Sequence, residues 1–216
     1  MLNEILNRKS VRTFSEQKIS DEDLRKILNA GILAPSWVNV QPWHFVVVKD
    51  AKLRDEMNKL CMQQPHVISA SDIILVIADV SAWKPENFSK VLAQNPRFKE
   101  IIDNIVNSPV YNPSLISEEI AKIRTVEQCA YAIENMLLEA EHLGISSCII
   151  GACANDFTKV NSEQHEIVKN MLRLKDGMFI FNAIVLGYNA DKETTIPRLR
   201  KEFCEVVSKD YVGNEF

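Results

Sequence analysis

Glycine is scarce in this chain, and its placement excludes the commonest nucleotide-binding loops. The six glycines lie far apart, and neither Gly-x-Gly-x-x-Gly nor Gly-x-x-x-x-Gly-Lys occurs. A Rossmann fingerprint and a P-loop are therefore both missing. If this protein binds a nucleotide, cationic side chains must replace the backbone cradle that such loops supply.

Long apolar runs and paired cysteines are missing as well. The longest apolar run, Ile73 to Ala78, has the length of a strand and not of a membrane span. The N-terminal residues predict no signal peptide. The five cysteines form no Cys-x-x-Cys pair, and an odd number of scattered thiols is typical of a reducing compartment. We expect a cytoplasmic protein with no membrane partner.

Metal-binding patterns are absent too. The four histidines show no ligand spacing. The segment His165-Glu166-Ile167-Val168-Lys169 begins like a zinc-protease helix but carries Lys where the second histidine is needed. No Gly-x-Ser-x-Gly elbow occurs either, and no cysteine has local support as a nucleophile. We therefore expect no metal and name no catalytic side chain.

Net charge is also small. The 216 residues carry a formal charge of -4, which gives no general attraction to nucleic acid. An anionic ligand would need a local cluster of cations. Arg8, Ser10 and Arg12 provide one, because alternate residues of an extended segment share a face. Arg198 and Arg200 provide a second. Arginine forks match phosphate oxygens, although each cluster alone is more often solvated surface charge than a binding site.

Hydrophobic periodicity predicts a mixture of helices and strands in irregular order. We expect helices at 21–33, 50–62, 117–143, 163–173 and 198–208, and strands at 44–49, 73–78, 146–151 and 178–188. The residues that should mark the buried face of the long helix are Ile120, Ile123, Ala130, Ile133, Leu137 and Ala140, with Cys129 and Met136 widening it. Because strands and helices do not alternate regularly, an α+β fold is favoured over a doubly wound sheet.

One segment differs in amino-acid composition from the rest. Residues 82–115 hold four of the eight prolines and several spaced aromatic residues. This pattern predicts short helices bounded by turns. We interpret residues 1–216 as a single domain with a helical excursion at about 82–115.

The order of two motifs provides a family resemblance. Arg8-x-Ser10-x-Arg12 is followed at 34–43 by Ala-Pro-Ser-Trp-Val-Asn-Val-Gln-Pro-Trp. This resembles the FMN-dependent nitroreductase family. The resemblance implies a homodimeric α+β sandwich, with a mostly antiparallel sheet between helices and extended termini that reach the partner. It also implies FMN as the cofactor, bound in the subunit interface.

The resemblance assigns roles to particular residues. Those implied to hold the FMN phosphate are Arg8, Ser10, Arg12, Arg198 and Arg200, with Arg198 standing where Lys is common. Those implied to cover the flavin ring from the partner subunit are Pro35, Ser36, Trp37 and Asn39. Trp37 departs from the small polar residue often found there. Without the resemblance, this segment could be an ordinary turn formed by Pro35, Ser36, Asn39 and Gln41, and Trp37 could be a core residue.

Two further positions follow from the same resemblance. The backbone at Ile150 and Gly151 is implied to reach flavin N5, although the family's usual Glu before that glycine is missing. Gln63 is implied to face the pyrimidine edge of the ring, and a solvated glutamine at a helix end is the alternative.

The implied activity is an oxidoreductase. Hydride would pass from NAD(P)H through flavin N5 to an electron-poor acceptor such as a nitroaromatic or a quinone. Two alternatives stay open. One is a specialised flavin enzyme on the same scaffold, acting in reductive dehalogenation or consuming the flavin. The other is a low-turnover FMN carrier or redox sensor, which would need a closed ring face.

Overall fold

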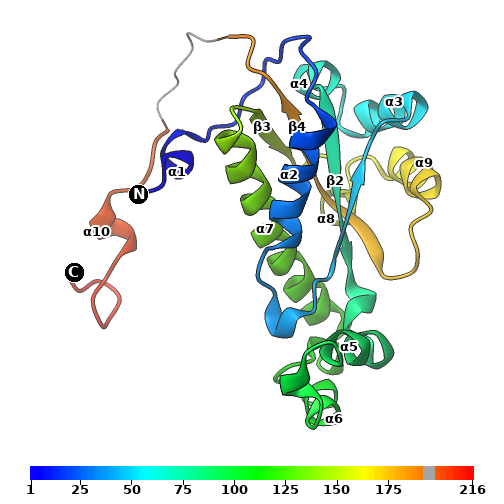
Figure 1. The fold of residues 1–216 in the computed structure, drawn as a ribbon, viewed down its shortest axis with the longest axis vertical. Helices are drawn as coiled ribbons and strands as arrows, with labels where there is room; N and C mark the ends of the chain where they lie inside the picture. Colours follow the sequence, from blue (N-terminus) through cyan, green and yellow to red (C-terminus); the bar gives the residue numbers. More distant parts are fainter. Residues whose placement is uncertain (192–197) are drawn as a thin grey trace.

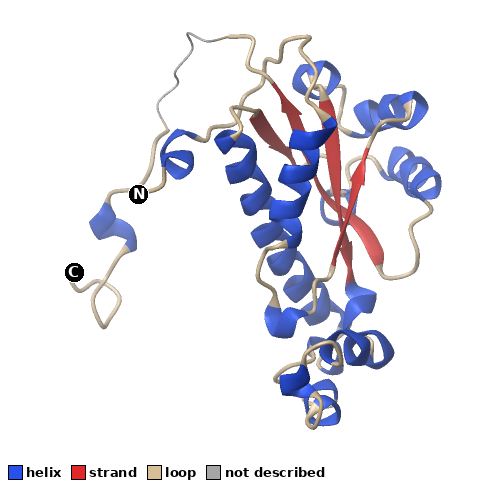
Figure 2. Ribbon diagram, in the orientation of Figure 1, coloured by secondary structure: helices blue, strands red, loops and turns tan. Residues whose placement is uncertain are grey.

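A four-stranded antiparallel sheet lies at the centre of the protein (Figures 1 and 2). The computed structural model describes residues 1–191 and 198–216. The strands are β1 (Trp43–Val47), β2 (Asp72–Asp79), β3 (Ser146–Ile150) and β4 (Met178–Gly187), in the order β1-β2-β4-β3. Every neighbouring pair runs antiparallel. The predicted α+β class and antiparallel sheet are confirmed.

Helices surround this sheet. The α-helices are α1 (Asn3–Asn7), α2 (Asp21–Ile32), α3 (Ala51–Leu60), α4 (Pro65–Ser69), α5 (Pro85–Leu92), α6 (Ile102–Val106), α7 (Glu118–His142), α8 (Asn155–Thr158), α9 (Ser162–Leu172) and α10 (Phe203–Val206). The 3-10 turns are η1 (Trp37–Asn39), η2 (Val80–Trp83), η3 (Pro96–Phe98) and η4 (Pro113–Leu115). The sequence did not predict α1, α4 or α8, because four or five residues are too few to show a helical period.

Each face of the sheet has its own hydrophobic core. Along β2, Ile73 and Leu75 point to the core that α3 and α9 cover, while Ile74 and Val76 point to the core that α2 and α7 cover. The two helix pairs lie on opposite sides of the sheet in Figure 1. Burial on both faces explains why β2 reads as a continuous apolar run.

The ends of the main helices follow their sequence signals. The Ser20 hydroxyl accepts a hydrogen bond from the Asp23 amide (3.0 Å) and caps the start of α2. Gly144 follows α7 with φ 71°, a conformation that favours glycine. The amide of Ile145 then donates to the carbonyl of Ala140 (2.8 Å).

The prediction for the buried face of α7 was correct from Cys129 onward, at Cys129, Ile133, Met136, Leu137 and Ala140, except at Ala130. Ile133 and Leu137 are buried as expected, but Ile123 is 53% exposed and Ala130 is also exposed. Before Cys129, the buried positions are Ala121, Thr125 and Gln128, none of which was predicted. The outer face of α7 therefore carries apolar side chains that this subunit does not cover.

The excursion forms a small core of its own. Buried Trp83 and Phe88 pack edge to face with ring centroids 5.6 Å apart. Val40, just after η1, and Ala121 of α7 join the same cluster. This packing ties the excursion to the rest of the chain. We propose that residues 1–216 form one domain.

The predicted helix at 198–208 is wrong in extent. Only Phe203 to Val206 is helical, and Leu199, Phe203 and Val206 are all exposed. A short amphipathic helix needs an apolar surface to pack on. This C-terminal segment instead runs away from the sheet beside the N-terminus (Figure 1).

Candidate functional site

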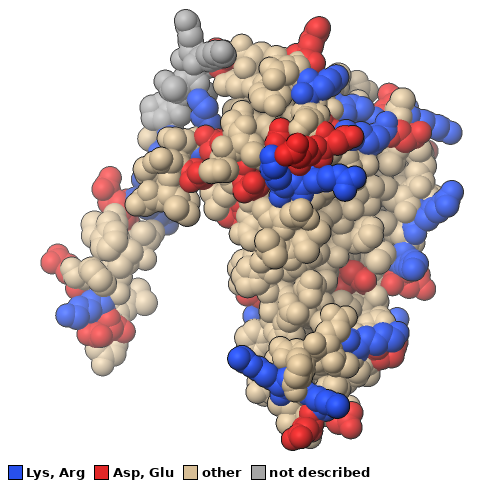
Figure 3. All heavy atoms as spheres, in the orientation of Figure 1, with Lys and Arg blue, Asp and Glu red and all other residues tan. Residues whose placement is uncertain are grey.

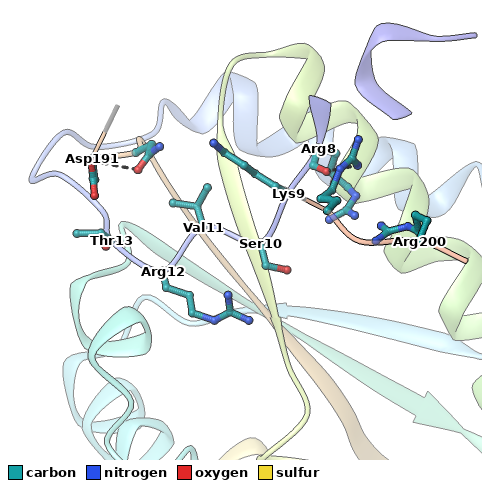
Figure 4. A pocket seen from close by; sticks show the side chains of 10 residues that line it. Arg8, Lys9, Ser10, Val11, Arg12, Thr13, Asp191 and Arg200 are labelled. Atoms are coloured by element: carbon teal, nitrogen blue, oxygen red, sulfur yellow. Dashed lines mark hydrogen bonds between the residues drawn. The ribbon is translucent and has the colours of Figure 1, made fainter. Parts of the chain in front are cut away.

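The two cationic clusters meet at one cavity. Its volume is about 450 Å³, and the residues that line it are Arg8, Lys9, Ser10, Val11, Arg12, Thr13, Asn189, Asp191, Arg198 and Arg200. Figure 4 shows the Ser10 and Arg12 side chains on one side of the N-terminal segment and Lys9 on the other. Five cationic residues therefore gather in a protein of net negative charge.

Pairing with the sheet edge explains the alternation in this segment. Ser10 lies beside Ser147 of β3 in a parallel bridge, and the Val11 amide donates to the Ser147 carbonyl (2.9 Å). Val11 is buried in the core. Its neighbours Ser10 and Arg12 are therefore directed outward, as extended backbone requires.

A glycine at the end of β4 lets the same segment lie close. Phe14 forms an antiparallel bridge with Asn189. A Cβ on Gly187 would lie 2.8 Å from the Phe14 ring, so a larger residue at this position would push the segment away. The position of Arg12 thus depends on Gly187 as well as on β3.

Arg198 makes contacts that the sequence did not indicate. Its guanidinium donates to the carbonyls of Ile5 (3.1 Å) and Arg8 (2.6 Å), and also to the carbonyl of Leu6. These carbonyls lie at the C-terminal end of α1, where backbone acceptors lack helical partners. Arg198 therefore links the C-terminal segment to α1 while it lines the cavity.

Two titratable groups that sequence reasoning missed lie beside the cluster. Burial raises the pKa of the Cys148 thiol, while Arg12, a hydrogen bond with Ser10 and the charge of Arg8 act in the opposite direction. Burial, and then the charge of Arg12, lower the pKa of His66. Both effects of Arg12 indicate a positive electrostatic potential beside the cavity. No local sequence pattern at Cys148 or His66 could have revealed that these residues lie near Arg12.

Positive charge gathers only locally. On the face drawn in Figure 3, acidic and basic side chains are interspersed. Among residues 1–191 and 198–216, no group of three or more potential ligands could hold a metal ion. Within the same ranges, every helix is too short or too polar to cross a bilayer.

The turn at Pro35–Asn39 lies far from this cavity. The N-terminal segment runs near the start of α2, whereas η1 follows its other end (Figure 1). The 12 residues of α2 span about 18 Å. Pro35, Ser36, Trp37 and Asn39 are thus not brought to Arg8 and Arg12 within one subunit. Gln63 is also outside the cavity lining, exposed after α3 with φ 52°.

Trp37 is not a core residue, so that alternative is wrong. The residue is 43% exposed. Its amide donates to Oε1 of buried Gln128 on α7 (2.8 Å), and the Arg124 guanidinium carbon lies 5.7 Å from the indole ring centroid. The side chain is therefore held in place and still presented to solvent.

The end of β3 offers an open surface. Ile150 is buried and Gly151 is exposed. A Cβ on Gly151 would meet only the Asn182 side-chain oxygen, at an ordinary contact distance of 3.7 Å. Packing within the protein therefore does not require a glycine at this position. Close approach of a ligand to the backbone would require one. From Ser147 to Gly151 the strand covers about 13 Å, a length suited to an elongated ligand with an anionic end at Ser10.

These features can be compared with known proteins. One relative, provisionally named an NADH dehydrogenase/NAD(P)H nitroreductase, comes from Archaeoglobus fulgidus. It is 29% identical over 189 residues, covering 88% of this chain and 85% of the relative. An FMN reductase (NADPH) of Bacillus subtilis is 23% identical, covering 92% of this chain and 69% of the reductase.

The fold is also similar to that of known nitroreductases. A nitroreductase-like protein from Streptococcus mutans superposes with a TM-score of 0.78 at 20% identity, covering 96% of each chain. The sequence profile of the nitroreductase family matches residues 5–188. The match spans both the cationic N-terminal segment and the turn at Pro35, and it ends at the last residues of the sheet. The chain therefore belongs to the nitroreductase family.

Proposed function

We propose that the protein is an FMN-dependent oxidoreductase that uses NAD(P)H to reduce an electron-poor acceptor such as a nitroaromatic or a quinone. The observation that carries this proposal is the convergence of the N-terminal and C-terminal arginines on one cavity beside β3. The FMN reductase relative adds support for the choice of flavin. A phosphate ester is the anion that such a cluster fits best.

The residues present fit FMN at both ends of its length. Arg8, Ser10, Arg12 and Arg200 would hold the phosphate, and the open backbone at Ile150 and Gly151 would lie against the ring. Bound FMN would supply the redox chemistry, taking hydride from NAD(P)H and passing it to the acceptor. The protein's own part is to bind, orient and shield. We assign no acid or base side chain to it.

A second copy of the chain is needed to complete this site. The turn at Pro35–Asn39 is separated from its own cavity by the length of α2. In a twofold dimer, the turn of one subunit can instead lie over the cavity of the other. Exposed apolar residues on α7, β3 and the C-terminal segment, including Ile123, Tyr131, Ile149, Phe203 and Phe216, would supply the interface.

The flavin carrier remains the second candidate because of one residue. Trp37 is large and exposed where the family often has a small side chain. An indole over the ring could exclude acceptors and slow turnover. A cytoplasmic location, suggested by the five free cysteines, stays a prediction.

Absorption spectroscopy tests the proposal. The purified protein should be yellow, with one FMN per subunit and no metal. NAD(P)H should bleach the flavin rapidly, and a quinone should restore its colour. Bleaching without prompt reoxidation would favour the carrier. A colourless protein that takes up no added FMN would remove the central claim.

A further inference from the structure

The turn that carries Trp37 has an unusual backbone. Val38, Asn39 and Gln41 have φ values of 49°, 58° and 49°. These lie in the left-handed region that non-glycine residues rarely adopt, and a β-branched residue such as Val38 is a clear outlier there. Such a conformation persists only where the surroundings determine it. The contacts of the turn should therefore reveal what holds it.

Local contacts account for part of the constraint. The Gln41 amide donates to the Ser36 hydroxyl oxygen (3.0 Å), and the Gln41 side chain donates to the Asn39 carbonyl (3.3 Å). Val40 is buried in the small core of the excursion. These contacts fix the end of the turn. The Val40 amide also donates to the Trp37 carbonyl (3.0 Å), whereas the contact to the Trp37 amide comes from elsewhere in the chain.

Trp37 is held by α7, from far along the chain. Its amide donates to Oε1 of Gln128, 91 residues away, and Gln128 is only 4% exposed. Arg124 lies one helical turn before Gln128, and its guanidinium carbon lies over the indole, 5.7 Å from the ring centroid. A buried glutamine carbonyl thus fixes the backbone of Trp37, and an arginine one turn away contacts the ring. The indole itself stays largely open to solvent.

We propose that Gln128 is a positioning residue, which sets the place of Trp37 above the flavin of the partner subunit and so limits the size of acceptor that can enter. The inference rests on the proposed function. The geometry favours it over a purely structural glutamine, because the hydrogen bond ends on the residue before a strained backbone. Without it, the strain at Val38 is opposed by fewer contacts, and the turn can relax.

Three variants test the assignment. Gln128→Leu keeps the size of the side chain and removes the acceptor for the Trp37 amide. Gln128→Glu retains an oxygen acceptor at the same reach. Gln164→Leu is the control. Gln164 is also a glutamine in a side-chain-to-backbone hydrogen bond, but on α9 and as the donor, to the Glu56 carbonyl (3.1 Å) and to Glu56 Oε2 (2.7 Å). The control should lower thermal stability without affecting the turn.

The first readout uses protein without FMN. Iodide quenching of Trp37 emission is obtained as the difference between each variant and the same variant carrying Trp37→Phe. Gln128→Leu should raise the quenching constant, Gln128→Glu should restore it at least in part, and Gln164→Leu should match the parent protein. A quenching constant unchanged in Gln128→Leu would overturn the positioning role.

The second readout is acceptor selectivity in the loaded enzyme. Losing one hydrogen bond should raise the population of the displaced turn by roughly fivefold. The ratio of kcat/KM for a bulky nitroaromatic to that for a small quinone should rise by about the same factor in Gln128→Leu, mainly through KM. Equal melting losses in Gln128→Leu and Gln164→Leu with unchanged selectivity would make Gln128 a packing residue only. A parent protein that binds no FMN would overturn the proposed function and the flavin part of this inference. The quenching result would still decide whether Gln128 holds the turn.

Discussion

Individual arginines in the cavity have different surroundings. Arg12 points outward from the N-terminal segment and alters the pKa of both Cys148 and His66. Arg198 lines the same cavity but donates to the carbonyls at the end of α1. Arg12 is therefore available to an anion, whereas Arg198 already has three acceptors.

Removing one arginine at a time should separate these roles. Arg12→Ala and Arg200→Ala should each weaken FMN binding by about 1.5–3 kcal/mol, the effect of losing a charge-assisted hydrogen bond. The melting temperature should hardly change, because neither residue is in the core. FMN titration followed by fluorescence gives the affinities. Arg25→Ala, on the exposed face of α2, is the control, and unchanged affinity in both cavity variants would mark them as surface charges.

Trp37→Ser tests the side chain that the turn presents. Because Trp37 is 43% exposed, its loss should cost far less than the about 3–5 kcal/mol typical of a buried tryptophan. Reduction of bulky nitroaromatics should become faster relative to small quinones. Thermal melts and kcat/KM for two acceptors measure both effects. A large fall in melting temperature with unchanged selectivity would contradict this prediction.

Local sequence predicted some of these residues and not others. The shared face of Ser10 and Arg12 follows from the alternation of extended backbone. Their meeting with Arg198 and Arg200 does not, because a local pattern carries no information on residues 190 positions apart. That meeting was expected from the family resemblance alone. Nothing in the sequence indicated a role for Gln128, because a polar residue on the buried face of a helix only interrupts the hydrophobic pattern.

At the scale of elements, α1 is attached to the rest of the subunit by few contacts. None of its residues is buried. It is held by Arg198 and by His142 of α7, whose Nδ1 lies 2.8 Å from Glu4 Oε1. The hydrogen bond to Glu4 raises the pKa of His142, and the same bond lowers the pKa of Glu4.

These shifts predict a pH window for the docking of α1. The His142 contribution is fully present below its ordinary pKa of 6.5 and is lost as the pH rises through the higher folded value. The Glu4 contribution is present above 4.5 and is lost as the pH falls through the lower folded value. Docking should therefore be strongest between these two ordinary values. Hydrogen-exchange protection of the Leu6 and Arg8 amides measures it, and an identical pH profile in His142→Gln would contradict it.

The long helix α7 shows what periodicity can and cannot predict. The apolar positions of its sequence were read as a single buried face. In the structure Ile133 and Leu137 are buried, while Ile123 is 53% exposed. Hydrophobic periodicity identifies residues that are buried in the assembled protein. It does not show whether their own subunit or a partner subunit covers them. The error at Ile123 is thus itself an argument for a partner.

For the whole molecule, that argument can be tested by placing a charge on the outer face of α7. Ile123→Asp would put a carboxylate into the proposed interface twice, once from each subunit of a twofold dimer. Each unpaired buried charge costs about 3 kcal/mol or more. Dimer affinity should fall by at least about 100-fold. Sedimentation velocity over a range of protein concentrations measures this change.

Ile167→Asp provides the control, because Ile167 is a comparably exposed isoleucine (41%) on α9, across the sheet from α7. It should remain dimeric with the parent's FMN affinity. In Ile123→Asp, FMN should be lost together with the dimer, because in the proposed dimer the turn at Pro35–Asn39 completes only the partner's cavity. Both should return when protein concentration is raised. A monomeric Ile123→Asp that binds FMN as tightly as the parent would show that one subunit forms the whole site, and an unchanged dimer would show that α7 does not face the partner at Ile123.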